Sequence, residues 1–294
     1  MELADRIVVV TGGASGIGRA LCERFAAAGA RTVAVVDRDA EGAARVAAGL
    51  GDRALAVAAD VGVEADVRAA VDRVEREAGP IDLFASNAGL VGGGGLDAND
   101  EVWSALWSVN VMAHVYAARA LVPRMVERGG GYLLTTASAA GLLTNLGNAP
   151  YSVTKHAAVA LAEWIAITYG DRGIKVSCLC PMAVDTPMLR GGAPVAGPDS
   201  ADTDPAGGLD GADPADRAPA DALAANAAAV QGVVSPERVA DAVVEGLADE
   251  RFLILPHPEV ADYERRRAGD RDRWLAGMRR LQASLLVAPD AGAS

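Results

Sequence analysis

Short apolar runs alternate along the chain with longer stretches in which apolar residues recur every three or four positions. The short runs predict β-strands at residues 7–10, 32–36, 54–58, 81–85, 132–136, 175–179 and 252–255. The longer stretches predict helices at residues 17–28, 39–50, 63–78, 99–128, 150–169 and 236–248. Such alternation is typical of right-handed units with parallel strands. The pattern therefore predicts an α/β fold, a doubly wound parallel sheet of about seven strands with helices on both faces.

One segment interrupts this alternation. In residues 191–229, 32 of 39 positions are Ala, Asp, Gly or Pro, a composition that buries little apolar surface. We expect either a flexible insertion without a role or a lid that orders when substrate binds. We assign all 294 residues to one domain, because open sheets of this size often form a single core.

Residues 256–294 form a predicted helical tail after the last strand. Seven arginines lie between Arg265 and Arg280. The tail is expected to be a solvated amphipathic helix, or a helix that packs over a substrate pocket. In the second case Trp274 and Met278, which are four residues apart, supply the apolar contact.

Charge and composition narrow the possible partners. The net charge of −12 argues against nucleic acid or an anionic membrane as the main partner. No apolar run approaches the roughly 20 residues of a membrane span, and the N-terminal run is too short for a signal peptide. The three cysteines show neither disulfide nor metal-ligand spacing. We therefore expect a cytoplasmic protein that holds no metal.

A glycine-rich turn joins the first predicted strand to the first helix. In the segment TGGASGIG at 11–18, Gly12, Gly16 and Gly18 allow a sharp turn and let backbone N–H groups approach a pyrophosphate. The following helix N-terminus adds partial positive charge. Many tight strand–helix turns contain glycine, but this position favours dinucleotide binding in a Rossmann-type fold.

Acidic residues end the second and third predicted strands. Asp37 lies 19 residues after Gly18, where a carboxylate can hold the adenosine ribose hydroxyls and repel a 2′-phosphate. This favours NAD over NADP, although Arg38 can accept a phosphate and Asp37 can be a simple helix cap. Asp60 precedes Val61 at the end of the third strand, where it can meet the adenine amino group or serve as a turn residue.

Tyr151 and Lys155 are four residues apart near the start of a predicted helix, so they share one helix face. A nearby ammonium lowers the pKa of a phenol. The pair can therefore transfer a proton near neutral pH, although the same spacing also occurs in surface pairs. Ser138 follows the fifth strand at the same sheet edge, where its hydroxyl can hydrogen-bond a carbonyl oxygen.

With these residues the chain resembles the short-chain dehydrogenase/reductase family. The matching segments lie in order over residues 5–190: TGGASGIG at 11–18, Asp37, DV at 60–61, NAG at 87–89, Asn110, Ser138, YSVTK at 151–155 and PMAVDTPM at 181–188. Each is short, but the ordered set is specific. The resemblance implies an oxidoreductase that interconverts a secondary alcohol and a ketone by hydride transfer, with NAD as cofactor and NADP less favoured.

The resemblance also implies roles for individual residues. Tyr151 would be the general acid/base, and Ser138 would orient the carbonyl. Lys155 would bind the nicotinamide ribose and lower the pKa of Tyr151, and Asn110 would support a water-mediated proton relay. Cofactor contacts are implied for Gly12, Ser15, Gly16, Ile17, Gly18, Asp37, Asp60, Val61, Asn87, Ala88, Gly89, Tyr151, Lys155, Pro181, Val184 and Thr186. Because family members commonly form tetramers through their long helices, here 101–128 and 150–170, a homo-oligomer (tetramer or dimer) is expected.

The chain departs from the family at Met182, where glycine is usual after Pro181. A side chain there is expected to crowd or cap the nicotinamide pocket. The residues expected around the substrate are mainly apolar and include no convergent Arg or Lys, which favours a neutral, hydrophobic small molecule; alternatively they only pack against the lid. They are Leu90, Val91, Ala139, Ala140, Leu142, Leu143, Asn145, Leu146, Asn148, Met182, Met188 and Leu189.

Two other functions stay open. The first is a regulatory or scaffold protein of the same fold that binds a dinucleotide without catalysis; intact Ser138, Tyr151 and Lys155 count against it. The second is epimerisation or dehydration of a nucleotide sugar, against which the single-domain length and the absence of a cationic substrate site argue. The histidines at 114, 156 and 257 show no ligand spacing, and we assign them no chemistry.

Overall fold

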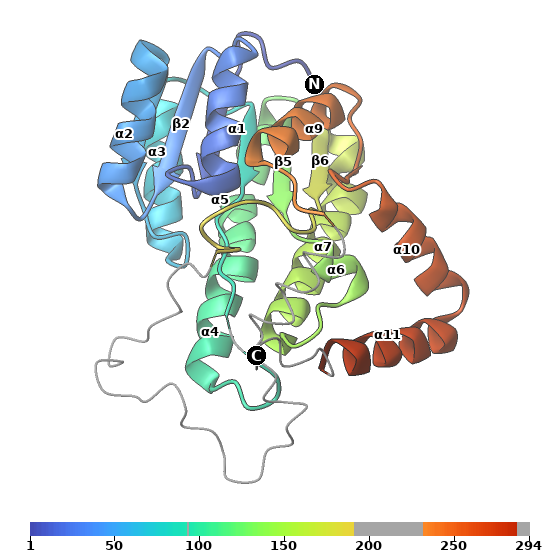
Figure 1. Cartoon of the computed structure of the whole chain (residues 1–294). Coiled ribbons are helices and arrows are strands. Elements are labelled where there is room, and N and C mark those ends of the chain that lie inside the picture. Colours follow the sequence, from blue (N-terminus) through green and yellow to red (C-terminus); the bar gives the residue numbers. More distant parts are fainter. Residues whose placement is uncertain (93, 191–231, 287–294) are drawn as a thin grey trace.

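The computed structural model describes residues 1–92, 94–190 and 232–286, and its centre is a parallel sheet (Figure 1). Its seven strands are ordered β3-β2-β1-β4-β5-β6-β7. The strands are β1 (Ile7–Thr11), β2 (Thr32–Asp37), β3 (Ala54–Ala58), β4 (Leu83–Ser86), β5 (Gly131–Thr136), β6 (Ile174–Leu179) and β7 (Leu253–Ile254). The predicted fold class is confirmed.

Helices cover both faces of this sheet. One face carries α1 (Gly16–Ala27), α2 (Ala40–Leu50) and α9 (Pro236–Ala248), and the other carries α3 (Glu64–Glu77), α5 (Ala113–Glu127) and α7 (Ala149–Tyr169). Short 3₁₀ turns, η1 (Gly51–Arg53) and η3 (Gly170–Arg172), lead into β3 and β6.

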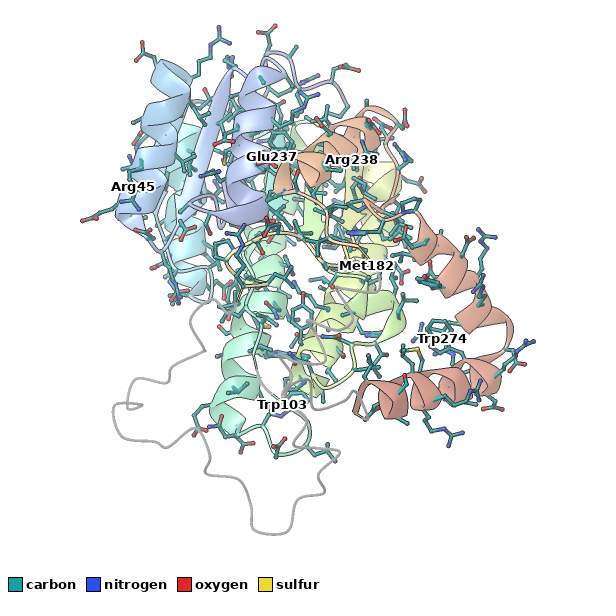
Figure 2. All side chains as sticks on the ribbon, viewed as in Figure 1. Arg45, Trp103, Met182, Glu237, Arg238 and Trp274 are labelled. Atoms are coloured by element: carbon teal, nitrogen blue, oxygen red, sulfur yellow. The ribbon has the colours of Figure 1, made fainter. Side chains whose placement is uncertain are left out.

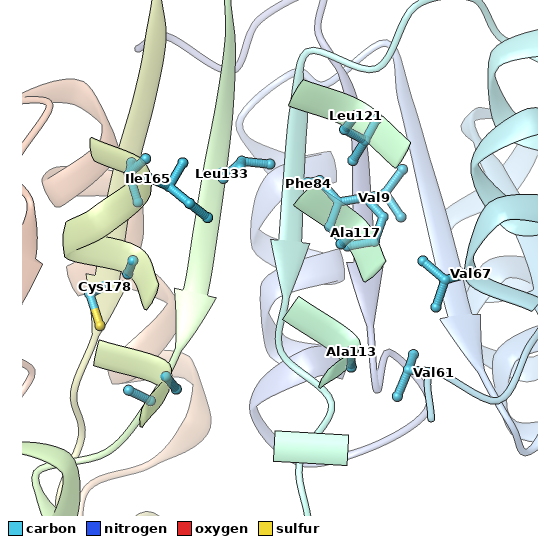
Figure 3. Close-up of a cluster of buried hydrophobic side chains, with 14 of the residues drawn as sticks. Val9, Val61, Val67, Phe84, Ala113, Ala117, Leu121, Leu133, Ile165 and Cys178 are labelled. Atoms are coloured by element: carbon cyan, nitrogen blue, oxygen red, sulfur yellow. The ribbon is translucent and has the colours of Figure 1, made fainter. Parts of the chain in front are cut away.

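The alternation of side chains along β1 explains why two layers of helices are needed. Ile7 and Val9 lie in the hydrophobic cluster with α3, α5 and α7, whereas Val8 and Val10 lie in the cluster with α1, α2 and α9. Because successive strand residues point to opposite faces, an unbroken apolar run buries both. Figure 3 shows the first cluster, with Val9 and Phe84 of the sheet facing Ala117 and Leu121 of α5.

The strand order fixes the place where a ligand can bind. β1 pairs with β2 on one side and with β4 on the other, so the connections run in opposite directions from this point. In open α/β sheets, ligands bind in the crevice outside the carboxyl ends of the strands at such a reversal. The glycine-rich turn and the segment after β4 meet there.

The structure divides the predicted helix 99–128 into three parts. They are α4 (Asp100–Trp107), a wide π-turn η2 (Ser108–Met112) and α5. Asn110 lies in the π-turn and is fully buried. One extra residue in a helical turn shifts the side chains that follow it, and such turns are frequent at functional sites.

Two further features were not predicted. A four-residue helix, α6 (Ala140–Leu143), follows β5, and the helical tail is two helices, α10 (Glu259–Gly269) and α11 (Arg271–Leu286). The break falls at Asp270, whose extended backbone ends α10. In Figure 1, α10 leaves the α/β core and α11 turns back below α6. The predicted lid at 191–229 lies outside the described residues.

In the part of the chain that the structure describes, no helix combines the length and apolarity needed to cross a membrane. The same part holds no group of three or more His, Cys, Asp or Glu side chains arranged to bind a metal ion.

Candidate active site

The glycine-rich turn between β1 and α1 has the backbone that its sequence requires. Gly12 and Gly16 have φ angles of 66° and 51°, a region in which a side chain is strained. A Cβ on Gly18 would lie 1.9 Å from the carbonyl oxygen of Gly12. Ser15 precedes α1 in an extended conformation, and its side chain makes no capping hydrogen bond to that helix. The turn therefore presents backbone and a hydroxyl at a helix N-terminus.

The carboxylate of Asp37 lies at the end of β2, beside this turn. Its oxygens accept hydrogen bonds from the backbone N–H of Ala14 and from that of Asp39, each at 3.0 Å. Asp39, rather than Asp37, caps α2, because it accepts from the N–H of Gly42. The two bonds hold the Asp37 side chain against the glycine-rich turn.

Asp60 sits in a turn of its own after β3. Its carboxylate accepts the N–H of Gly62 at 2.8 Å, and its own N–H donates to Asp66. Val61 is buried in the cluster beneath α3. These contacts match the alternative in which Asp60 is a turn residue, and its second oxygen is the one left for a ligand.

Asn87 ties the ends of three strands together. Its backbone N–H donates to the hydroxyl of Thr11, its side-chain amide donates to the carbonyl of Thr11, and its Oδ1 accepts from the hydroxyl of Thr136. Ala88 N–H also donates to the Thr11 hydroxyl. The segment Asn87–Gly89 is thereby fixed across the carboxyl edge of β1, β4 and β5.

Asn110 holds the next stretch of that segment. Its side chain accepts from the N–H of Leu90 at 2.8 Å and donates to the carbonyl of Leu90 at 3.0 Å. Its amide nitrogen is also 3.2 Å from the hydroxyl of Thr154 on α7. The π-turn thus aims Asn110 at both the segment after β4 and the helix that carries Tyr151.

Tyr151 and Lys155 lie on the same face of α7, as their spacing predicts. The Lys155 Nζ is 5.6 Å from the centroid of the Tyr151 ring, and it donates to the carbonyl of Thr136 at 3.1 Å. A Cβ on Gly89 would lie 3.4 Å from both Lys155 Nζ and Asn110 Oδ1. Gly89 therefore leaves room directly beside the lysine.

The pKa values of this pair follow burial. Burial lowers the pKa of the Lys155 ammonium to about 8, because a charge is costly in a low-dielectric site. Burial also raises the pKa of the Tyr151 phenol above its ordinary value, and the Ser138 hydroxyl acts in the opposite direction. The expectation that Lys155 lowers the pKa of Tyr151 is therefore not met in this structure. Desolvation is the largest influence on the phenol pKa, and the Lys155 ammonium is bonded to the carbonyl of Thr136.

Ser138 follows β5 and begins the turn into α6. Its hydroxyl accepts from the N–H of Ala140 at 3.1 Å and donates to the carbonyl of Pro181 at 3.4 Å. The Ala139 N–H donates to the same carbonyl at 2.8 Å. Ser138 is thus held between the helix that follows it and the loop after β6.

The loop after β6 is fixed from two sides. The methyl carbon of Thr186 would lie 3.2 Å from a Cβ on Gly16, so this loop touches the glycine-rich turn. Val184 pairs with Val234 as an isolated parallel bridge. At Met182 the side chain packs, half-buried, against the cluster beneath α7, while its backbone N–H donates to Nδ1 of His257 at 3.2 Å.

Four residues of this network were given no role from the sequence. Thr11, Thr136 and Thr154 bond the predicted site residues, and His257 supports the loop at Met182. The threonines at the ends of β1 and β5 are a usable signal, because hydroxyls there face the ligand edge of the sheet.

The residues present fit a nicotinamide dinucleotide. A side chain at Gly12 or Gly18 would collide with neighbouring atoms. The glycines therefore leave the backbone of the turn accessible beside a helix N-terminus. Asp37 borders one end of this turn, and Gly89, which lies beside Lys155, follows Asn87, whose amide is bonded to Thr11 at the start of the turn. Backbone cradles of this kind accept pyrophosphate, and an acid beyond them accepts a ribose.

A cavity of about 640 Å³ lies between α11 and the loop after α6. It is lined by Leu143, Thr144, Leu146, Arg267, Arg271, Asp272, Trp274, Leu275, Met278, Arg279 and Gln282. Leu143 and Leu146 belong to the expected substrate residues, and Trp274 points from α11 toward α10 (Figure 2). The expectation that no Arg or Lys converges on those residues is wrong for this cavity, because folding brings the distant tail to them.

Comparison with known proteins agrees with this geometry. The family model described as short chain dehydrogenase matches residues 6–193. A 1-deoxy-11-beta-hydroxypentalenate dehydrogenase from Streptomyces avermitilis is 33% identical over 270 residues, which cover 88% of this chain and 87% of that protein. A 3beta-hydroxysteroid dehydrogenase 2 from Eggerthella lenta is 37% identical over 185 residues, which cover 61% of this chain and 71% of that protein.

A solved structure is similar to this chain beyond the range of the motifs, residues 5–190. A short chain dehydrogenase/reductase from Burkholderia phymatum in complex with NAD superposes with a TM-score of 0.78 at 28% identity, over 92% of this chain and 96% of that one. The chain therefore belongs to the short-chain dehydrogenase/reductase family, whose members are oxidoreductases that bind a nicotinamide dinucleotide.

Proposed function

We propose that this protein is an NAD-dependent dehydrogenase/reductase that interconverts a secondary alcohol and a ketone, with Tyr151 as general acid/base. The observation that carries the proposal is the meeting of Tyr151, Lys155 and Ser138 at the carboxyl edge of the sheet, with Lys155 Nζ 5.6 Å from the Tyr151 ring. The names of the relatives, a hydroxypentalenate dehydrogenase and a hydroxysteroid dehydrogenase, support an alcohol or ketone on a carbon-rich framework.

Each side chain has a role in this proposal. The raised pKa of Tyr151 keeps its phenol protonated at neutral pH, so it can donate a proton to a carbonyl oxygen during reduction. The Ser138 hydroxyl holds that oxygen in place as charge develops on it. In the direction of oxidation, the phenolate form of Tyr151 accepts the alcohol proton and becomes the phenol, and the adjacent Lys155 ammonium is the group that would stabilise this phenolate.

The bound nicotinamide would supply or receive the hydride, and several residues would hold it. We assign the pyrophosphate to the turn with Gly12, Ser15, Gly16, Ile17 and Gly18, and the adenine side to Asp37, Asp60 and Val61. The nicotinamide side is assigned to Asn87, Ala88, Gly89, Lys155, Pro181, Val184 and Thr186. The Asp37 carboxylate favours NAD over NADP, because it would repel a 2′-phosphate.

Asn110 belongs to the proposed proton path. It is fully buried and holds Leu90 on one side and Thr154 on the other. Its position beside Lys155, with Gly89 between them, supports a relay from Tyr151 through the lysine and water to solvent. Asn110 keeps the relay groups in place and does not itself touch the carbonyl of the substrate.

We also propose a homo-oligomer assembled through the long helices. On α7, Val153, Trp164 and Ile167 share one face and are 47%, 56% and 83% exposed. On α4, Trp107 is 43% exposed. Large apolar side chains gathered on one helix face indicate a protein interface. Because α4 and α7 lie in contact, we infer that their exposed apolar residues meet a second copy of the chain.

Replacing Tyr151 by Phe tests the proposed function. In the full-length protein, ketone reduction would be followed by NADH absorbance over a panel of neutral and acidic ketones. The loss of a positioned proton donor is expected to lower kcat by about 10²- to 10⁴-fold, while the Kd for NADH stays within about twofold.

Tyr169→Phe is the matched control, because Tyr169 ends the same helix and has no part in the site. It should retain full activity. Unchanged turnover in Tyr151→Phe would refute the assignment of Tyr151. Tight NADH binding without turnover of any ketone by the unsubstituted protein would instead favour a dinucleotide-binding regulatory or scaffold protein.

A further inference from the structure

The cavity beneath α11 combines apolar walls with an excess of positive charge. Its apolar lining comes from Leu143 and Leu146 on one side and from α11 on the other. Three arginines and one aspartate also line it, in a chain whose net charge is −12. The volume of about 640 Å³ falls among those of small-molecule sites, which are roughly 300–1,000 Å³.

Two of these arginines differ from the neighbouring Arg265 in their partners. Arg265, on the same helix as Arg267, pairs with Asp262. Within residues 1–92, 94–190 and 232–286, neither Arg267 nor Arg271 forms an ion pair with a carboxylate. Arg267 instead has a guanidinium nitrogen 3.3 Å from Nε2 of His156 on α7.

The two guanidinium groups also repel each other. Burial lowers the pKa of Arg267, the charge of Arg271 lowers it further, and the charge of Glu264 acts in the opposite direction. Arg267 is half-buried at the junction of α10 and α7. Two close cations beside apolar side chains are stabilised by an anion that bridges them, since arginine binds carboxylates through paired hydrogen bonds.

One wall of the cavity is formed by the end of α6 and the loop after it, the segment that follows Ser138. Leu143 ends α6, whose first residue, Ala140, donates its N–H to Ser138. Four residues lie between Ser138 and Leu143, a separation of roughly 8 Å along the axis at the rise of a helix. On the other side of the loop, Ser152 accepts from the N–H of Asn145, next to Tyr151. The segments on this side of the cavity are thus bonded to residues that neighbour Ser138 and Tyr151.

We propose that this cavity binds the anionic end of an amphipathic substrate, a carboxylate on a hydrocarbon framework, with Arg267 and Arg271 as its ligands. The proposal rests on the proposed function and names the substrate class for the same site. The alcohol or ketone would lie at Ser138 and Tyr151, the framework against Leu143, Leu146 and Trp274, and the carboxylate at the arginines. Arg267 and Arg271 are specificity-determining residues that do not take part in the chemistry.

A matched pair of ketones tests this inference. The full-length enzyme with NADH would be assayed with 9-oxodecanoate and with its methyl ester, which differ only in charge. We expect kcat/KM to be at least about tenfold higher for the acid, which corresponds to one charge-assisted contact. The double variant Arg267→Ala/Arg271→Ala should lose this preference and keep its rate with the ester.

The control is Arg266→Ala/Arg273→Ala, which removes the same charge from the same two helices at positions that do not line the cavity. It should retain the preference for the acid. Equal rates with acid and ester in the unsubstituted enzyme, or equal losses in both double variants, would overturn the inference. If the unsubstituted enzyme reduces the ester and Tyr151→Phe does not, the proposed function stands whether or not the acid is preferred.

A binding measurement covers the case in which neither ketone is turned over. Trp274 lines the cavity, so decanoate should change the tryptophan fluorescence in a saturable way, and Trp274→Phe should remove that signal. Arg267→Ala/Arg271→Ala should weaken the binding at least about tenfold. Absence of saturable binding, or equal binding of decanoate and its methyl ester, would refute the anion site independently of catalysis.

Discussion

The imidazole of His257 accepts a hydrogen bond from the backbone of Met182, with Nδ1 3.2 Å from the amide nitrogen. His257 is only 3% exposed, and burial lowers its pKa, so the ring is neutral and its Nδ1 can accept. The bond joins the segment between β7 and α10 to the loop that follows β6. The C-terminal helices are therefore coupled to the side of the crevice that we assign to the nicotinamide.

Replacing His257 by Leu should both destabilise the protein and weaken cofactor binding. A buried N–H without an acceptor costs about 1–3 kcal/mol, and the partly buried N–H of Met182 is expected at the lower end of this range. The free loop should raise KM for NADH more than it lowers kcat. Urea unfolding and steady-state kinetics measure these effects. His257→Asn is the matched control, because an amide oxygen can replace Nδ1 as acceptor; equal losses in the two variants would contradict the role of the hydrogen bond.

The buried His114 should make the protein sensitive to acid. Its Nδ1 lies 2.7 Å from the hydroxyl of Ser86, and burial together with the charge of Lys155 lowers its pKa from 6.5 to about 3. Between these two values the unfolded chain binds a proton that the folded chain does not, so stability falls as pH falls. The contribution lost between pH 7 and pH 5 is about 2 kcal/mol.

The His114→Asn variant isolates this contribution. Asn can keep a hydrogen bond to Ser86 and does not titrate, so its free energy of unfolding should depend less on pH over this interval. Urea unfolding of both proteins at pH 7 and pH 5 gives the difference. If the two proteins lose the same stability between these pH values, His114 is not the group responsible.

Asp37 should set the choice between the two nicotinamide cofactors. Its carboxylate is held by the N–H groups of Ala14 and Asp39, so the negative charge stays beside the glycine-rich turn. Asp37→Ser should raise the ratio of kcat/KM for NADPH to that for NADH at least about tenfold, because a like-charge contact is removed. Asp39→Ser, which keeps an N-cap oxygen, is the control and should leave the ratio unchanged. A preference of the unsubstituted enzyme for NADPH would refute the assignment.

The exposed apolar face of α7 should be buried between subunits. Ile167→Asp introduces a charge at the most exposed of its large apolar residues, 83% accessible in one chain, and is expected to dissociate the oligomer. Light scattering after size-exclusion chromatography measures the mass directly. Val233→Asp, at an apolar residue that is 47% exposed in the segment before α9, should not change it. A monomeric unsubstituted protein would rule out the proposed assembly.

The sequence alone determined the features that depend on neighbours along the chain. Alternating strand and helix periodicity predicted the seven parallel strands, because burial on both faces requires unbroken apolar runs. Gly12 and Gly16 marked a turn that needs positive φ. The four-residue spacing of Tyr151 and Lys155 placed them on one helix face.

Only the tertiary structure decided the features that depend on residues far apart in sequence. Met182 and His257 are 75 residues apart, and the break before α11 turns Arg271 and Trp274 toward the cavity beside Leu143. Local patterns contain no information about such pairs, because they depend on how the elements pack. Burial is also a tertiary property: the spacing of Tyr151 and Lys155 predicted a lowered phenol pKa, and desolvation in the folded chain raises it instead.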